Sequence, residues 1–412
     1  MGTAKRKRTV VLIVCAGLLT AAAVAMAVRR GPAKQVAQPV EQKLKATPKK
    51  QPTIVAQPVE EKRAVQPSPK PIARPKVDIV FVLDTTGSMS GLLAGAKRKI
   101  WSIANSVMRG QPRPDLRIGL IGYRDLGDSY VTRRYALTSE IDDVYQQLRR
   151  LRADGGGDFP EHVNRALAEA IRKMQWRRGK VLRQVFLVGD APPHEGRDGL
   201  YSHQLAQEAK QRGIIINAVR CGRAPQTGVA WRRIANDAGG VYASVRQDGA
   251  VIARHTPYDA KLAKLNRDLS ATLLPMGGAD RKAASRRRVA SNVAMGDLEQ
   301  ADSAAFRARA KRLDGDDLVD NLAAGRAKLD KLPAKDLPKP LAALGVEGRR
   351  AYVANVRAKR ASLRREILQL SKKREGYLKT TSKTSGASAS PSFDDKVTEA
   401  VEAQGRAHGI AY

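Results

Sequence analysis

Residues 77–88 read VDIVFVLDTTGS and decide the fold of this chain. The first seven residues are an almost continuous apolar run of mostly β-branched and aromatic type, as expected of a strand buried on both faces. The run stops at Asp84, and apolar residues spaced three or four apart then continue from Leu92 to Val107. That spacing predicts a helix directly after the strand.

The alternation of strand and helix continues outward from this stretch to residue 245. Further strands are predicted at 116–123, 130–137, 185–188, 214–219 and 241–245. Further helices are predicted at 141–151, 162–174, 203–211 and 231–236. This order predicts an α/β fold of the Rossmann-like, doubly wound type, in which helices cover both faces of a mostly parallel sheet. We assign this domain to residues 77–250.

Oxygen-bearing side chains gather where the predicted strands end. Residues 84–88 (DTTGS) follow the first strand, and Asp190 follows the strand at 185–188. Ligands of open sheets bind at the carboxyl ends of the strands, so these side chains are expected at one edge. A glycine-rich loop at 155–161 (GGGDFPE) adds two carboxylates. The candidate ligand set is Asp84, Thr86, Ser88, Asp158, Glu161 and Asp190.

This set of side chains suits a hard divalent cation. Two hydroxyls with nearby carboxylates match an ion that takes six oxygen ligands and keeps some waters. Mg²⁺ is the first choice, with Mn²⁺ or Ca²⁺ as alternatives. Asp125 follows the strand at 116–123 and is either a supporting residue of the site or an ordinary turn acid. The alternative for the whole set is that the acids cap helices and accept hydrogen bonds from loop amides without metal.

The pattern at 77–248 resembles the von Willebrand factor A domain and its metal-ion-dependent adhesion site. The family's Asp-x-Ser-x-Ser motif is matched by residues 84–88, with Thr86 in place of the middle serine. Asp190 falls where the family has an aspartate after the fourth strand. The family's threonine between these two motifs is absent, and Asp158 stands near its place. The stretch 158–161, Asp-Phe-Pro-Glu, resembles the metal loop of integrin β subunits and hemicentin-like members.

The resemblance implies ligand capture rather than catalysis. A partner's Asp or Glu carboxylate would complete the coordination of the ion. The resemblance leaves open whether Asp158 or Glu161 contacts the ion, and we favour Glu161. His194 and Glu195 lack the surrounding pattern of a hydrolytic site. We therefore predict no catalytic residue and expect His194 to be an isolated surface histidine.

Residues 1–30 form a predicted signal peptide or membrane anchor. A basic cluster at 5–8 precedes an uncharged run at 9–28, which is long enough to reach across a bilayer core of about 30 Å. The excess of basic residues before the run favours an amino terminus that stays inside. Residues 31–76 are a proline-rich linker. These segments predict an exported protein of bacterial type, which is either anchored in the inner membrane and facing the periplasm or secreted.

The part of the chain beyond residue 250 is predicted to be helical and basic. Helices are expected at 258–274, 279–313 and 348–378 within a basic region at 251–379, before a flexible hinge and a short helix in 380–412. The whole chain has 75 Lys+Arg against 40 Asp+Glu, a net charge of +35. Such a charge favours anionic partners. An alternative function is therefore a basic envelope scaffold that binds anionic polymers or lipid headgroups around a structural metal site. An aromatic content of 4% disfavours nucleic acid.

Overall fold

The computed structural model describes residues 74–157, 159–248, 254–384 and 392–412. The predicted membrane segment at 1–30 and nearly all of the predicted linker lie outside these ranges. Within them, no helix combines the length and apolar composition that crossing a membrane requires.

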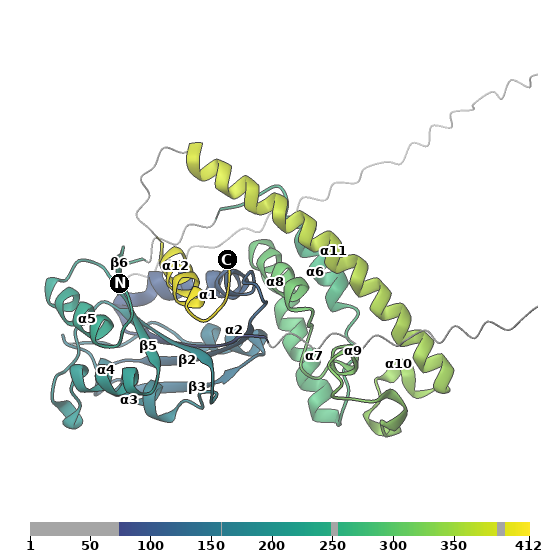
Figure 1. Ribbon diagram of the computed structural model, residues 1–412, viewed down its shortest axis with the longest axis horizontal. Helices are drawn as coiled ribbons and strands as arrows, with labels where there is room; N and C mark the ends of the chain where they lie inside the picture. Colours follow the sequence, from purple (N-terminus) through teal and green to yellow (C-terminus); the bar gives the residue numbers. More distant parts are fainter. Residues whose placement is uncertain (1–73, 158, 249–253, 385–391) are drawn as a thin grey trace, which may run out of the picture. The chain divides into compact units, whose positions relative to one another are not determined.

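A six-stranded sheet in the order β3-β2-β1-β4-β5-β6 forms the centre of the α/β domain (Figure 1). All neighbouring strands are parallel except the β2–β3 pair, which is antiparallel. The mostly parallel sheet predicted from the sequence is thus confirmed. The strands are β1 Lys76–Asp84, β2 Asp115–Tyr123, β3 Thr132–Thr138, β4 Val181–Gly189, β5 Ile214–Cys221 and β6 Tyr242–Val245.

Helices cover both faces of the sheet because successive residues of β1 point to opposite sides. Phe81 and its alternate neighbours pack against α1 (Ser90–Val107) and α2 (Ile141–Arg150) on one face. Val80 and Val82 pack with three other helices on the second face. These helices are α3 Val163–Lys173, α4 Ser202–Gln211 and α5 Pro225–Asp237. Each predicted helix of the domain is present, with α5 beginning earlier than expected.

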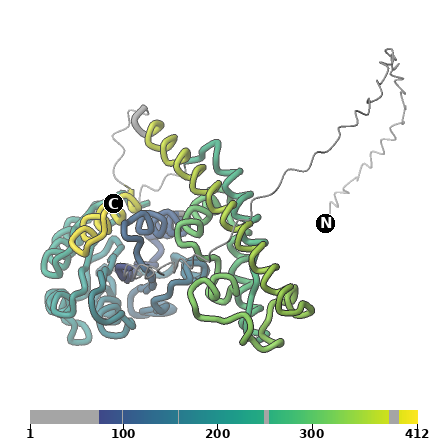
Figure 2. Tube along the Cα trace, turned by 45° about the vertical axis from the view of Figure 1, so that its right-hand side comes forward, coloured from purple at the N-terminus to yellow at the C-terminus, as the bar shows by residue number. Residues whose placement is uncertain are grey.

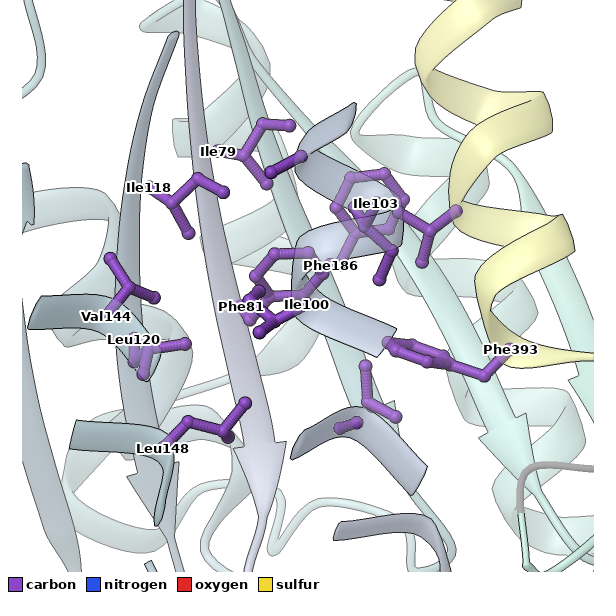
Figure 3. Close-up of a cluster of buried hydrophobic side chains, with 14 of the residues drawn as sticks. Ile79, Phe81, Ile100, Ile103, Ile118, Leu120, Val144, Leu148, Phe186 and Phe393 are labelled. Atoms are coloured by element: carbon purple, nitrogen blue, oxygen red, sulfur yellow. The ribbon is translucent and has the colours of Figure 1, made fainter. Parts of the chain in front are cut away.

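The helix α12 (Phe393–Arg406) packs on the same face of the sheet as α1 (Figures 1 and 2). Its residue Phe393 is buried, and its ring lies 6.3 Å from the ring of Phe81, in the cluster drawn in Figure 3. At the other end of α12, the side chain of Gln404 hydrogen-bonds Gln184 of β4 and Asn217 of β5. The sequence predicted a short helix here but not its place in the core of the α/β domain.

The segment between β6 and α12 is helical, as predicted, and differs from the expectation in two places. The expected helix at 279–313 is two helices, because the chain turns at Ala294–Gly296 and buries Met295 in the core. The helix α11 continues to Thr384, so the expected hinge does not begin at 380; residues 385–391 lie outside the described ranges. The helices are α6 Asp259–Ser270, α7 Ala279–Val293, α8 Asp297–Ala310, α9 Leu318–Ala323, α10 Lys339–Ala342 and α11 Val346–Thr384.

Buried arginines connect the elements of this helical region. Arg360 of α11 is fully buried, and its guanidinium lies 2.7 Å from a carboxylate oxygen of Asp317. Arg374, also on α11, pairs with Asp259 at 2.6 Å and with Asp302 at 2.7 Å. These pairs place each buried carboxylate beside a cation of the same chain, which offsets the cost of removing both charges from water.

Candidate functional site

The carboxyl end of β1 places three of the predicted ligands together. Asp84 is fully buried, and its Oδ1 accepts hydrogen bonds from the Thr86 amide at 2.9 Å and the Thr86 hydroxyl at 2.7 Å. The Thr86 and Ser88 hydroxyl oxygens are 3.3 Å apart. The turn that follows is held by the Gly87 amide, which donates to the Gly155 carbonyl at 3.0 Å. The residues of the DTTGS motif therefore converge, as the sequence predicted.

Asp190 follows β4, the neighbour of β1, and lies beside Asp84. Gly189 lets the two strands approach, since a Cβ atom there would lie 2.9 Å from Cβ of Asp84. Burial, followed by the negative charge of Asp190, raises the pKa of Asp84 to about 7. The Asp190 carboxylate accepts a hydrogen bond from the Gln247 side-chain amide at 2.5 Å. The structure thus brings the predicted carboxylates of the two strands together.

Glu161 reaches the same place from the glycine-rich loop and is 4% exposed. The loop passes between Thr86 and Glu161 at Gly156, where φ is +75° and a Cβ atom would lie 2.9 Å from Cβ of Thr86. Only glycine fits that backbone without strain. Burial, then the charges of Asp84 and other nearby acids, raises the pKa of Glu161 to about 9. Asp158, the other predicted ligand of this loop, lies outside the described residues.

Asp125 lies at the same edge in a supporting position. Its carboxylate is 3.1 Å from Nε2 of His194, and its amide donates to the Asp128 carboxylate at 3.2 Å. Asp128 also accepts a hydrogen bond from the Gly156 amide, which fixes the glycine-rich loop. The expectation that His194 is an isolated surface histidine is wrong, because its side chain is only 11% exposed and pairs with Asp125.

Two functional contacts have no strong signal in the sequence. The sequence around Asp128 does not predict its role, although its position three residues after Asp125 in a short polar loop is compatible with a supporting residue. Gln247 belongs to no motif that would indicate a role at the site. Its contact with Asp190 arises because the loop after β6 reaches past β5 to the residues that follow β4 and β1.

The oxygen atoms at this edge fit a divalent cation. Asp84 Oδ2 and Glu161 Oε2 are buried and accept no hydrogen bond from any described residue. A buried carboxylate oxygen without a donor is costly unless a proton or a cation neutralises it. No cluster of three or more His, Cys, Asp or Glu side chains in the described part of the chain is arranged to hold a metal alone. The hydroxyls of Thr86 and Ser88 would add neutral oxygen ligands of the kind that Mg²⁺ accepts.

The comparisons with known proteins agree with the fold. Residues 78–249 match the family model of the von Willebrand factor A domain. The match covers less than half of the chain and coincides with the Rossmann-like sheet and its flanking helices, and a domain of this kind suggests a role in protein interaction or adhesion.

The chain also resembles individual proteins over this domain. It is 34% identical over 118 residues to a putative ariadne-like RING finger protein of Acanthamoeba polyphaga mimivirus, covering 29% of this chain and 11% of that protein. It is 31% identical over 138 residues to von Willebrand factor A domain-containing protein 7 of Homo sapiens, covering 34% and 14%. The chain thus spans a small part of these relatives. The mussel byssus proximal thread matrix protein 1, solved with zinc in its MIDAS motif, aligns at 15% identity and a TM-score of 0.34, covering 42% of each chain.

Proposed function

We propose that this chain is a binding protein that captures a carboxylate of a protein ligand through a divalent cation, with Mg²⁺ as the first choice. The observation that carries the proposal is the pair of buried oxygens, Asp84 Oδ2 and Glu161 Oε2, that have no hydrogen-bond donor among the described residues. The residues that would hold the ion are Asp84, Thr86, Ser88, Asp190 and Glu161. Asp158 is a further candidate from the same loop.

The residue types at the site favour binding of an anionic partner. When bound, the cation supplies a concentrated positive charge that attracts an anionic oxygen. Thr86 and Ser88 contribute neutral hydroxyl ligands, so the charge of the ion is only partly compensated by the protein. Asp125 and Asp128 hold His194 and the glycine-rich loop in place. Nothing in this arrangement requires a nucleophile or a general base, so we assign no catalytic residue.

Thermal unfolding with and without Mg²⁺ tests this proposal. A ligand that binds only the folded state stabilises it, by about 2.7 kcal/mol at a concentration 100-fold above Kd. We expect Mg²⁺ to raise the melting temperature of the chelator-treated protein, and Asp84→Asn and Asp190→Asn each to abolish the rise. The control is Asp268→Asn, an exposed acid on α6 that pairs with Lys264 and should keep the rise. An equal Mg²⁺ response in the wild type and both site variants would overturn the assignment.

We further propose that the chain is exported, either anchored in the inner membrane and facing the periplasm or secreted. The support is the basic cluster and apolar run at 1–30 and the linker that follows. Residues 1–76 fused to a reporter enzyme that is active only outside the cytoplasm should give activity in a bacterial host. Replacing the run at 9–28 by a polar sequence should remove it. Equal activity of both fusions would contradict export by this segment.

The second candidate function is binding of an anionic envelope polymer or a lipid surface. The observation that favours it lies on α11, where Arg357, Arg365 and Lys372 are exposed seven or eight residues apart. None of them forms an ion pair with another residue in the described ranges. Salt separates the two functions, because polymer binding falls steeply with ionic strength whereas a metal bridge is removed by chelator.

A further inference from the structure

The strand order places different loops on the two sides of the candidate cation site, along the carboxyl edge of the sheet. Strands β2, β1, β4, β5 and β6 are parallel in that spatial order, so the loops after their carboxyl ends lie along one edge. The candidate ligands Asp84 and Asp190 follow the two central strands. The loop after β2 therefore lies on one side of the cation site, and the loops after β5 and β6 lie on the other.

The loop after β2 and the glycine-rich loop, which is tied to it, each present an apolar side chain to solvent. Leu126, in the loop after β2, is 48% exposed, and Phe159, in the glycine-rich loop, is 51% exposed. Asp128 holds these two loops together, since it accepts hydrogen bonds from the amides of Asp125 and Gly156. Large apolar side chains that are exposed next to a candidate binding site mark a contact surface.

The β5–β6 side presents cations. Arg223 follows β5 and Arg246 follows β6, and both line an open hollow of ≈ 570 Å³. Arg246 pairs with Asp248 at 3.0 Å, whereas Arg223 forms no ion pair with another described residue. The Gln247 amide donates to Asp190 at 2.5 Å and to the Ser88 carbonyl at 3.3 Å, which fixes this loop to the cation site.

We infer that the ligand is an acidic peptide segment whose metal-bound carboxylate lies between an apolar residue and a second acidic residue. This rests on the proposed function. The apolar residue contacts Leu126 and Phe159, and the second acid pairs with Arg223 and Arg246. Strands lie about 4.8 Å apart and an extended peptide advances about 3.3 Å per residue. Each flanking residue therefore stands roughly two or three positions from the metal-bound Asp or Glu.

Labelled synthetic peptides with one central Glu test this ligand class by fluorescence anisotropy, in Mg²⁺ and in chelator. In the two mixed peptides, Phe stands two positions from the central Glu on one side, and a second Glu stands two positions away on the other side. The two peptides differ in which side carries Phe. The reference peptides carry Phe at both positions or Glu at both. We expect one mixed peptide to bind about tenfold more tightly than either reference peptide, a difference of about 1.4 kcal/mol.

Two variants assign the two sides of the edge. We expect the double variant Arg223→Gln, Arg246→Gln to bind the preferred mixed peptide about tenfold more weakly. Its affinity for the peptide with two Phe residues should not change. The double variant Leu126→Ser, Phe159→Ser should bind both the mixed peptide and the peptide with two Phe residues more weakly. Its affinity for the peptide with two flanking Glu residues should not change. The control Arg212→Gln removes an exposed arginine between α4 and the amino end of β5, at the opposite end of that strand from Arg223, and should change no affinity.

The outcomes separate this inference from the function on which it rests. Equal Mg²⁺-dependent binding of all four peptides, or unchanged preferences in both double variants, overturns the inference alone. No Mg²⁺-dependent peptide binding, with the Mg²⁺-induced rise in melting temperature intact, overturns the ligand class and leaves the cation site standing. Loss of both signals in the wild type overturns the proposed function as well.

Discussion

The buried carboxylates of the helical region lie beside arginines, whereas the buried carboxylates at the carboxyl edge of the sheet do not. In the helical region, Asp317 pairs with Arg360 at 2.7 Å, and Asp302 pairs with Arg374 at 2.7 Å. At the carboxyl edge of the sheet, no lysine or arginine of the described ranges forms an ion pair with Asp84 or Glu161. A charge buried in protein needs a partner. The helical region therefore supplies its own cations, whereas the sheet edge leaves its buried carboxylates for the divalent cation that we propose.

The pKa values of the acids describe the same difference. Burial raises the pKa of Asp302 too, but Arg374 opposes that shift. At the sheet edge neighbouring acids add to the effect of burial, and the pKa values reach about 7 for Asp84 and about 9 for Glu161. Without a cation, these two groups keep protons that an exposed carboxyl would lose.

The largest expected effect is in the helical region. Arg360→Met should destabilise the protein by about 3–5 kcal/mol, because it leaves Asp317 buried without its cation. Denaturant unfolding measures the change. Arg357→Met, three residues away on the exposed side of α11, should alter the free energy of unfolding by less than about 0.5 kcal/mol. Equal losses in both variants would remove the contrast between the two regions.

The same type of substitution should act with opposite signs in the two regions. In chelator at pH 8, Asp317→Asn should lower the free energy of unfolding by about 3 kcal/mol, because it removes the closer of the two carboxylates that pair with the buried Arg360. Asp84→Asn should raise the free energy of unfolding by about 1 kcal/mol. The asparagine oxygen still accepts the hydrogen bonds from Thr86, while a buried charge is removed. Denaturant midpoints of the two variants give the signs. A loss in Asp84→Asn as large as that in Asp317→Asn would show that Asp84 is already compensated in the metal-free protein.

The pH dependence of stability should differ between the metal-free and metal-loaded protein. Asp84 and Glu161 have the ordinary carboxyl pKa values of 3.8 and 4.5 in the unfolded chain and raised pKa values in the folded protein. The unfolded state therefore binds fewer protons than the folded state above about pH 4, and these groups lower stability as the pH rises toward about 9. Melting temperatures in chelator should show this fall.

Two controls define that pH effect. The double variant Asp84→Asn, Glu161→Gln should have a flatter profile in chelator, and Mg²⁺ should flatten the profile of the wild type. A wild-type profile that is unchanged by both treatments would contradict the raised pKa values as the cause.

The smallest expected effect concerns an exposed ion pair. Arg172 and Glu208 lie 2.8 Å apart on the surface of the α/β domain, and Arg172 lowers the pKa of Glu208. Glu208→Gln should cost less than about 1 kcal/mol, and high salt should reduce the cost further, because exposed pairs are screened by solvent. A loss as large as that of Arg360→Met would show that burial is not what separates the strong pairs from the weak ones.

The sheet and most of the candidate site could be predicted from the sequence, because short stretches of the chain encode them. Buried parallel strands are continuous apolar runs, and the residues that follow their carboxyl ends meet at one edge whatever lies between them. Asp84 and Asp190 could therefore be paired from their positions alone. Three other features depend on which elements pack together. They are the break between α7 and α8 at Ala294–Gly296, the place of α12, and the contact of Gln247 with Asp190. No local pattern encodes those choices.

The place of α12 has a consequence for biosynthesis. The face of the sheet that carries Phe81 is covered partly by α1 and α2 and partly by Phe393 and its neighbours, which follow β6 by roughly 150 residues. A ribosome adds about 5–20 residues per second, so the part of this face under α12 stays open for about 7–30 s after the last strand emerges. During that interval the nascent domain exposes an apolar surface, which makes it a substrate for chaperones until the distal helix arrives.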